Sequence, residues 1–345
     1  MSEKRSRKPL IVPIFMPNEG CPDRCIYCHQ EKITAQATRI LDPVTVRGIL
    51  ESAVGSAKFD RGRRREVAFY GGTFTRLPLV RMAELLDAVA PYLKEGTFDS
   101  IRVSTRPDAI DEERLDLLRQ FGVDTVELGA QSMDDEVLAL SRRGYAARHI
   151  LSSARLLREY GFKVGIQLMP GLPGDSEEKF METVEEVTRL RPDMVRLYPT
   201  VVIRGTELAR WYMEGRYRPL GLEEAVRICR ESCIRLEGKG IPVIRIGLMS
   251  SPSLLEQGQI MAGPWHEAFG FLVRSDIFHK GVEPYLPKPG QANKIRIRVS
   301  PREIPLVRGY KNAGLRAIEL KTGARVEGVF PDDGLAYGKI EVEGV

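Results

Sequence analysis

The stretch GCPDRCIYC, residues 20–28, holds three of the five cysteines of this 345-residue chain. These are Cys21, Cys25 and Cys28, with Tyr27 directly before the last of them. Thiolates this close in sequence favour a soft metal ion or an iron–sulfur cluster. A structural zinc site uses four ligands, and no fourth cysteine stands nearby. Three cysteines on a four-iron cubane leave one iron open to bind a substrate, so the stretch predicts a cluster that takes part in chemistry.

The composition is that of a globular chain with a sizeable core. Hydrophobic residues make up 43%, and the net charge of +5 permits an anionic partner without requiring one. No apolar run is long enough to span a bilayer, and Leu10–Phe15 is too short for the core of a signal peptide. A few clustered cysteines are typical of a reducing compartment. We therefore expect a cytoplasmic protein without a membrane partner.

Apolar, β-branched runs alternate with amphipathic helical patterns over most of the chain, which predicts an α/β fold with a parallel sheet and crossover helices. Functional residues should gather at the carboxyl ends of such strands. The predicted strands are Leu10–Phe15, Glu66–Tyr70, Ile101–Ser104, Thr125–Gly129, Lys163–Leu168, Met194–Leu197 and Pro242–Ile246. The predicted helices are Leu79–Leu93, Glu112–Phe121, Arg148–Tyr160, Glu177–Leu190 and Glu223–Glu237.

The sequence changes in character from about Leu254, where glycine, proline and short apolar runs become frequent. We expect one domain over residues 1–250, and a substrate-gating loop followed by a small β-rich appendage over residues 251–345. The strands predicted for this appendage are Lys294–Val299, Ala317–Lys321 and Lys339–Val342.

Polar and glycine-rich motifs stand at the ends of the predicted strands, where each alone could be an ordinary turn. Taken together and in order with the cysteine triplet, they resemble the radical S-adenosylmethionine (radical SAM) superfamily. Within it, they are similar to the radical SAM domain of the Elongator catalytic subunit and its bacterial relatives. The resemblance covers residues 11–246. The motifs are GGTF at 71–74, TRPD at 105–108, ELGAQS at 127–132, and YPT at 198–200 followed by VIRGT at 202–206.

This resemblance implies an incomplete (β/α)6 TIM-like radical SAM barrel, a [4Fe-4S] cluster on Cys21, Cys25 and Cys28, and SAM as the second cofactor. In the superfamily the open iron binds the amino and carboxyl groups of SAM. One electron from the cluster then splits SAM into methionine and a 5′-deoxyadenosyl radical. Such a reaction implies a cellular one-electron reductant as a partner.

The resemblance also implies a set of SAM-contacting residues. The Gly-Gly run corresponds to one that bonds the SAM amino group, and Tyr27 to an aromatic residue whose backbone meets the adenine. Relatives often carry an acidic residue at the position of Ser104, and a charged one at that of Gln167. The implied cofactor-binding residues are Tyr27, Gly71, Gly72, Thr73, Ser104, Gln131, Arg143 and Gln167.

Three further features bear on the reaction. His266, one of four histidines, is a candidate general acid or substrate contact, although a packing role explains it as well. Cys229 and Cys233 are four residues apart on a predicted helix and are expected to be core thiols. The resemblance does not extend to the acetyltransferase domain of the Elongator subunit, because no phosphate-cradling glycine-rich run follows the barrel.

The favoured substrate is RNA, in particular tRNA, through the family resemblance and the cations of the appendage. On a strand, Lys294, Arg296 and Arg298 would share one face that could hold a nucleic-acid backbone. A solvated sheet face explains the same pattern. Two alternatives remain open: radical chemistry on a small-molecule or porphyrin-like substrate, and an iron–sulfur or SAM sensor without turnover.

Overall fold

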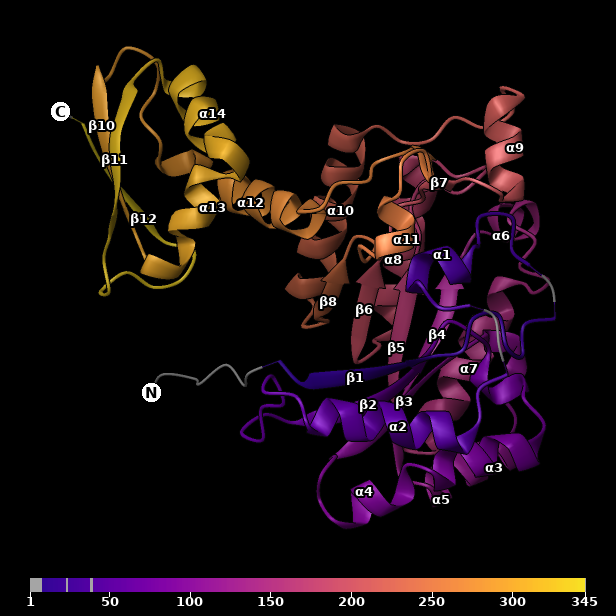
Figure 1. Cartoon of the computed structure of the whole chain (residues 1–345). Coiled ribbons are helices and arrows are strands. Elements are labelled where there is room, and N and C mark those ends of the chain that lie inside the picture. Colours follow the sequence, from indigo (N-terminus) through magenta and orange to yellow (C-terminus); the bar gives the residue numbers. More distant parts are fainter. Residues whose placement is uncertain (1–7, 23, 38–39, 345) are drawn as a thin grey trace.

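Seven parallel strands form one sheet in the order β1-β2-β3-β4-β5-β6-β8 (Figure 1). The computed structural model describes residues 8–344 except 23 and 38–39. Neighbouring strands are joined by helical crossovers, and the edge strands β1 and β8 do not pair with each other in the described part of the chain. This arrangement confirms the incomplete barrel. The strands are β1 (Leu10–Phe15), β2 (Arg65–Tyr70), β3 (Ser100–Thr105), β4 (Val123–Gln131), β5 (Lys163–Leu168), β6 (Met194–Leu197) and β8 (Val243–Ile246).

The helices follow the predicted amphipathic patterns with one exception. The expected helix Leu79–Leu93 is two helices, because Pro91 cannot continue the first and instead occupies the first turn of the second. The helices of this part are α1 (Gln30–Thr34), α2 (Pro43–Val54), α3 (Leu79–Asp87), α4 (Ala90–Lys94), α5 (Glu112–Gln120), α6 (Asp135–Leu140), α7 (Ala147–Glu159), α8 (Glu177–Leu190), α9 (Glu207–Met213), α10 (Leu222–Gly238), α11 (Pro252–Leu255) and α12 (Phe269–Val282).

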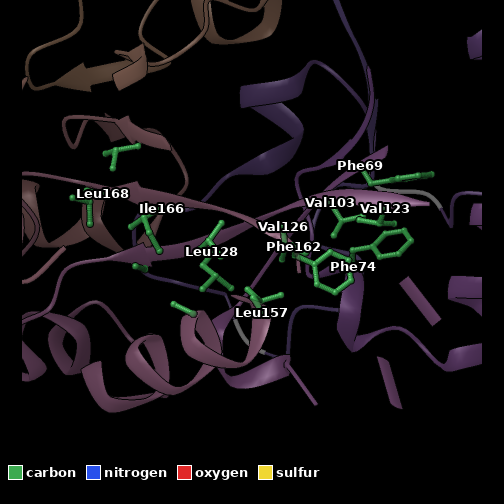
Figure 2. Packing of buried hydrophobic residues seen from close by; sticks show 14 of the residues in the cluster. Phe69, Phe74, Val103, Val123, Val126, Leu128, Leu157, Phe162, Ile166 and Leu168 are labelled. Carbon is green, nitrogen blue, oxygen red and sulfur yellow. The ribbon is translucent and has the colours of Figure 1, made fainter. Parts of the chain in front are cut away.

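Alternation along the strands separates an apolar face from a polar one. On β4, Val126, Leu128 and Ala130 are fully buried in the main hydrophobic cluster, whereas Glu127 and Gln131 line a cavity. Figure 2 shows the apolar side, where side chains from several strands pack together with Leu157 of α7. The rings of Phe69 and Phe74 meet there at 4.8 Å between centroids. The polar alternate positions therefore face the inside of the barrel.

The C-terminal part is an α/β unit with its own core. Its sheet has the order β11-β10-β12, and the prediction of a strand at Ala317–Lys321 is wrong, because these residues lie in α14. The buried residues Gly314, Ile318 and Thr322 are four apart, which is the spacing of a helix face. The elements are β10 (Lys294–Val299), α13 (Ile304–Arg308), α14 (Ala313–Thr322), β11 (Arg325–Pro331) and β12 (Ile340–Gly344).

Helix α12 joins the two cores. Phe269 and Val273 near its start belong to the barrel cluster, whereas Phe278 and Val282 near its end belong to the cluster of the appendage. Figure 1 shows α12 leading from α10 to the appendage, whose sheet lies away from the barrel. The proposed division near residue 250 stays a prediction, and the packing favours a gradual transition along α12. Within the described residues, no helix combines the length and apolarity needed to cross a bilayer.

We expect Ile297→Ala to destabilise the appendage by about 2–5 kcal/mol, because Ile297 is fully buried on β10. Hydrogen exchange of β10 amides measures that loss. Both tryptophans, Trp211 and Trp265, precede α12, so their fluorescence follows the barrel.

The exposed neighbour Arg298→Ala is the control, with an expected change within about 0.5 kcal/mol. Tryptophan fluorescence gives a second free energy of unfolding for Ile297→Ala. If that free energy fell as much as the one from hydrogen exchange of the β10 amides, barrel and appendage would unfold as one unit.

Candidate active site

A cavity of about 510 Å³ opens at the carboxyl ends of the strands. Its size is within the range of small-molecule and cofactor sites. The structure brings together eleven of the twelve predicted site residues around it and leaves out only His266. The eleven are Cys21, Cys25, Tyr27, Cys28, Gly71, Gly72, Thr73, Ser104, Gln131, Arg143 and Gln167.

The cysteine loop is the stretch at 20–28 that holds Cys21, Cys25 and Cys28. Each of its three thiols contacts a polar group at the cavity wall. Cys21 Sγ lies 3.3 Å from Thr73 Oγ1, and Gln30 Nε2 donates to Cys28 Sγ at 3.5 Å. Burial raises the pKa of the Cys21 thiol, and burial together with the nearby Cys25 raises the pKa of Cys28 to about 12. A bound cation would therefore favour the thiolate forms of Cys21 and Cys28.

In the described part of the chain, no three His, Cys, Asp or Glu side chains are arranged as a ready-made set of ligands for one metal ion. An iron–sulfur cluster requires a different arrangement of its ligands, because each thiolate binds a different iron atom. The donor set, three soft thiols on the wall of one cavity with the other two cysteines in the barrel core, fits such a group.

Arg143 fixes the cysteine loop to the barrel. Its Nη1 donates to Cys25 Sγ at 2.9 Å and to Tyr27 Oη at 3.2 Å, while its Nη2 donates to the Gly129 carbonyl oxygen at 2.6 Å. Burial by itself would lower the pKa of this guanidinium. The contacts with Tyr145, Tyr27 and Cys25 raise the pKa by more than burial lowers it, so the net shift is well upward. The group therefore stays cationic beside Cys25.

The Gly71–Gly72 turn packs backbone against backbone on the segment before the cysteine loop. Thr73 N donates to the Glu19 carbonyl oxygen at 2.8 Å. A Cβ at Gly72 would lie 2.4 Å from that oxygen and 2.7 Å from the Met16 carbonyl oxygen. The glycine is therefore required by the fold itself, in addition to the SAM contact that the resemblance implies.

Two amides meet at the ends of β4 and β5. Gln167 Nε2 donates to Gln131 Oε1 at 3.1 Å. Gln131 has a φ of 71°, which is uncommon for a residue with a long side chain. Strained backbone of this kind is typical of functional sites, because the surrounding structure must enforce it.

Sequence reasoning missed a buried ionic network below these residues. Glu127 Oε1 lies 2.6 Å from Arg102 Nη1, and Glu127 Oε2 lies 2.8 Å from Arg196 Nε. Arg196 Nη2 also donates to Tyr70 Oη at 2.6 Å. Glu127 and Arg196 line the cavity, so its floor is polar although the charges are paired. The available signal was polar residues at inward-facing alternate positions of β4 and β6.

His266 lies away from the cavity lining. Its ring meets that of Tyr310 edge-to-face at 4.7 Å, and its Nδ1 accepts from Ala268 N at 3.0 Å. Tyr310 Oη donates to Glu267 Oε1 at 3.0 Å, so this group joins the loop before α12 to the appendage. These contacts favour the packing role, and a catalytic role of His266 stays a prediction.

Comparisons with known proteins agree with this geometry. The family model of the radical SAM superfamily matches residues 16–187, and that of the Radical_SAM C-terminal domain matches residues 192–278. An uncharacterized protein of Methanocaldococcus jannaschii is 30% identical over 228 residues, which cover 64% of this chain and 70% of that protein. The chain belongs to the radical SAM superfamily and is an enzyme, and its cofactors are a [4Fe-4S] cluster and SAM.

The named relatives include a tRNA uridine(34) acetyltransferase and an Elongator protein. A tRNA uridine(34) acetyltransferase of Dehalococcoides mccartyi is 33% identical over 230 residues, covering 58% of this chain and 50% of that protein. Human Elongator complex protein 3 is 30% identical over 185 residues, which cover 47% of this chain and 34% of that protein. The structure of archaeal Elp3 from Methanocaldococcus infernus, with an N-terminal deletion, has a TM-score of 0.60 at 24% identity, covering 80% and 64%. This chain thus spans half or less of the two named sequence relatives.

We expect Gly72→Ala to lower both the thermal midpoint and the iron retained after reconstitution, because the added Cβ separates the turn from the segment that leads to the cysteine loop. Iron content and differential scanning calorimetry measure the two effects.

Ser104→Ala is the matched control, since it removes a cavity-lining hydroxyl without adding an atom. Unchanged stability and iron content in Gly72→Ala would contradict the role given to the backbone contact.

Proposed function

We propose that this enzyme cleaves SAM reductively at a [4Fe-4S] cluster held by Cys21, Cys25 and Cys28, and that the resulting radical modifies tRNA. The observation that carries the proposal is the position of the three thiols on the wall of one cavity, while Cys229 and Cys233 lie fully buried in the barrel core. When bound, the cluster and SAM supply the electron and the carbon radical.

Side chains of the protein itself bind SAM and orient the cysteine loop. The amide pair of Gln131 and Gln167 offers donors and acceptors for the polar groups of SAM, and Ser104 adds a hydroxyl at the same wall. Arg143 sets the position of Cys25 and Tyr27. The paired charges of Arg196 and Glu127 give a polar floor that can hydrogen-bond a ligand without presenting a large net charge to it.

The tRNA proposal is supported by the tRNA-modifying relatives. The appendage gives it less support than the sequence suggested. Lys294, Arg296 and Arg298 do share an exposed face, but Glu327 pairs with the first two and Glu343 with the third. Both acids lie beyond the basic stretch in sequence, on the neighbouring strands β11 and β12. We further propose a cytoplasmic location and a cellular one-electron reductant.

We expect anaerobically reconstituted protein to hold about four irons, and Cys21→Ala with Cys25→Ala and Cys28→Ala to remove them together with the brown chromophore. Cys229→Ala with Cys233→Ala is the matched control and should keep the chromophore. Iron retained in the triple variant would refute the ligand assignment.

We expect the reduced protein to form 5′-deoxyadenosine from SAM, measured by liquid chromatography, whereas a sensor without turnover would form none. Mass analysis of tRNA nucleosides from a strain lacking this protein should show the loss of one modified nucleoside. Unchanged nucleosides together with an altered small metabolite would refute tRNA and favour the small-molecule substrate.

A further inference from the structure

A second cavity, of about 370 Å³, lies beside the cysteine loop and has no role in the proposed SAM chemistry. Its walls come from three segments: the end of α6, the loop after β5, and α9 with its connection to α10. We call it the flanking cavity. It is lined by Leu140, Leu172, Pro173, Gly174, Asp175, Trp211, Arg216, Tyr217 and Arg218.

The flanking cavity is lined by the aromatic side chains of Trp211 and Tyr217 and by two cations. The Arg216 guanidinium lies over the Trp211 ring, 4.7 Å from its centroid, in a cation–π contact. Trp211 Nε1 donates to Glu207 Oε1 at 3.2 Å, which orients the ring. Aromatic rings and arginine planes are the surfaces on which single-stranded bases stack.

The cations of this cavity are available to an anion. Arg218 is exposed and makes no hydrogen bond or ion pair within the described residues. Arg216 pairs with Glu214 at 3.1 Å, but both side chains are about half exposed, so the pair contributes little. The cations on β10 of the appendage are about as exposed as Arg216, and each of them faces a carboxylate: Glu327 for Lys294 and Arg296, and Glu343 for Arg298. Arg218 differs from them, because it has no carboxylate partner among the described residues.

One carboxylate gives the cavity an acceptor for base amino groups. Asp175 Oδ2 accepts from Gly171 N at 2.8 Å, and its Oδ1 accepts from Ser176 N at 3.0 Å. Each carboxylate oxygen keeps a further lone pair, because a carboxylate accepts about four hydrogen bonds. Tyr217 Oη donates to the Gly171 carbonyl oxygen at 2.5 Å and so fixes the same loop.

The flanking cavity and the main cavity have no lining residue in common, but their linings are close along the chain after β5. Met169 lines the main cavity and Leu172 the flanking one, and three residues span at most about 11 Å. Leu208 N on α9 donates to the Ile26 carbonyl oxygen at 2.8 Å, and Trp211 packs in one hydrophobic cluster with Ile26 and Tyr27 of the cysteine loop. The elements that line the flanking cavity therefore contact the cysteine loop, which itself lines the main cavity.

We propose that the flanking cavity binds a nucleobase next to the modified nucleotide of tRNA, that the base takes the place of the Arg216 guanidinium on the Trp211 ring, and that the displaced Arg216 and Arg218 contact the adjoining phosphates. The proposal rests on tRNA being the substrate, and it places the recognition surface beside the cysteine loop and not on the appendage.

The test measures binding of unfractionated tRNA to the reconstituted full chain by fluorescence anisotropy over a series of salt concentrations. Loss of stacking in Trp211→Ala should weaken binding about 5- to 150-fold. Arg218→Glu should weaken binding and flatten the slope of log affinity against log salt by about 0.7–0.9 for each lost phosphate contact. Wild-type tryptophan fluorescence should be quenched by tRNA, and Trp211→Phe should bind tRNA but lose most of that quench.

Arg298→Glu on the appendage is the matched charge reversal and should change affinity much less. Arg218 is exposed, so its variant tests the proposal even if Trp211→Ala does not fold. If wild-type protein binds tRNA and both flanking-cavity variants bind it as well as the wild type does, the role proposed for the flanking cavity is refuted while the proposed function stands. Weakening by Arg298→Glu alone would assign binding to the appendage. If the wild type itself does not bind tRNA, the substrate proposal fails, and this one fails with it.

Discussion

One buried guanidinium connects the parts on which the active site depends. Arg143 donates to Cys25 and Tyr27 of the cysteine loop and to the backbone of β4 at Gly129. Arg106 in turn donates to the Arg143 carbonyl oxygen at 2.5 Å while its guanidinium is held by Asp108. The TRPD motif therefore supports Arg143, and Arg143 supports the loop. A loop alone would not hold three thiols at a defined wall, since loops are the mobile part of a fold.

Successive side chains on the strands around this centre point alternately outward and inward. Their outward positions pack against helices, and their inward positions carry Glu127, Gln131, Gln167 and Arg196 into the lumen. Burying these polar groups would cost free energy if they were unpaired, and the structure pairs amide with amide and guanidinium with carboxylate. The result is a rigid polar lumen at the same edge of the sheet as the cysteine loop.

The sequence predicted every strand of the main sheet, and eleven of its twelve candidate site residues line one cavity, because motifs at strand ends must meet at one edge of a parallel sheet. It could not predict that Gly72 is required by the backbone of Glu19, since that contact joins distant segments. It missed the Glu127–Arg196 pair, because alternation marks each residue as inward-facing but does not say which residue on another strand is its ionic partner. Ala317–Lys321 was assigned to a strand because a short run does not distinguish a strand from a helix.

The central claim is that three cysteines leave one iron open to SAM. Electron paramagnetic resonance of the reduced, reconstituted protein tests it most directly, with spectra recorded before and after the addition of SAM. We expect the signal of a reduced [4Fe-4S] cluster whose shape changes when SAM binds the open iron, and we expect Ser104→Ala to keep the signal of the SAM-free cluster. A cluster signal that SAM leaves unchanged at saturating concentration would contradict it.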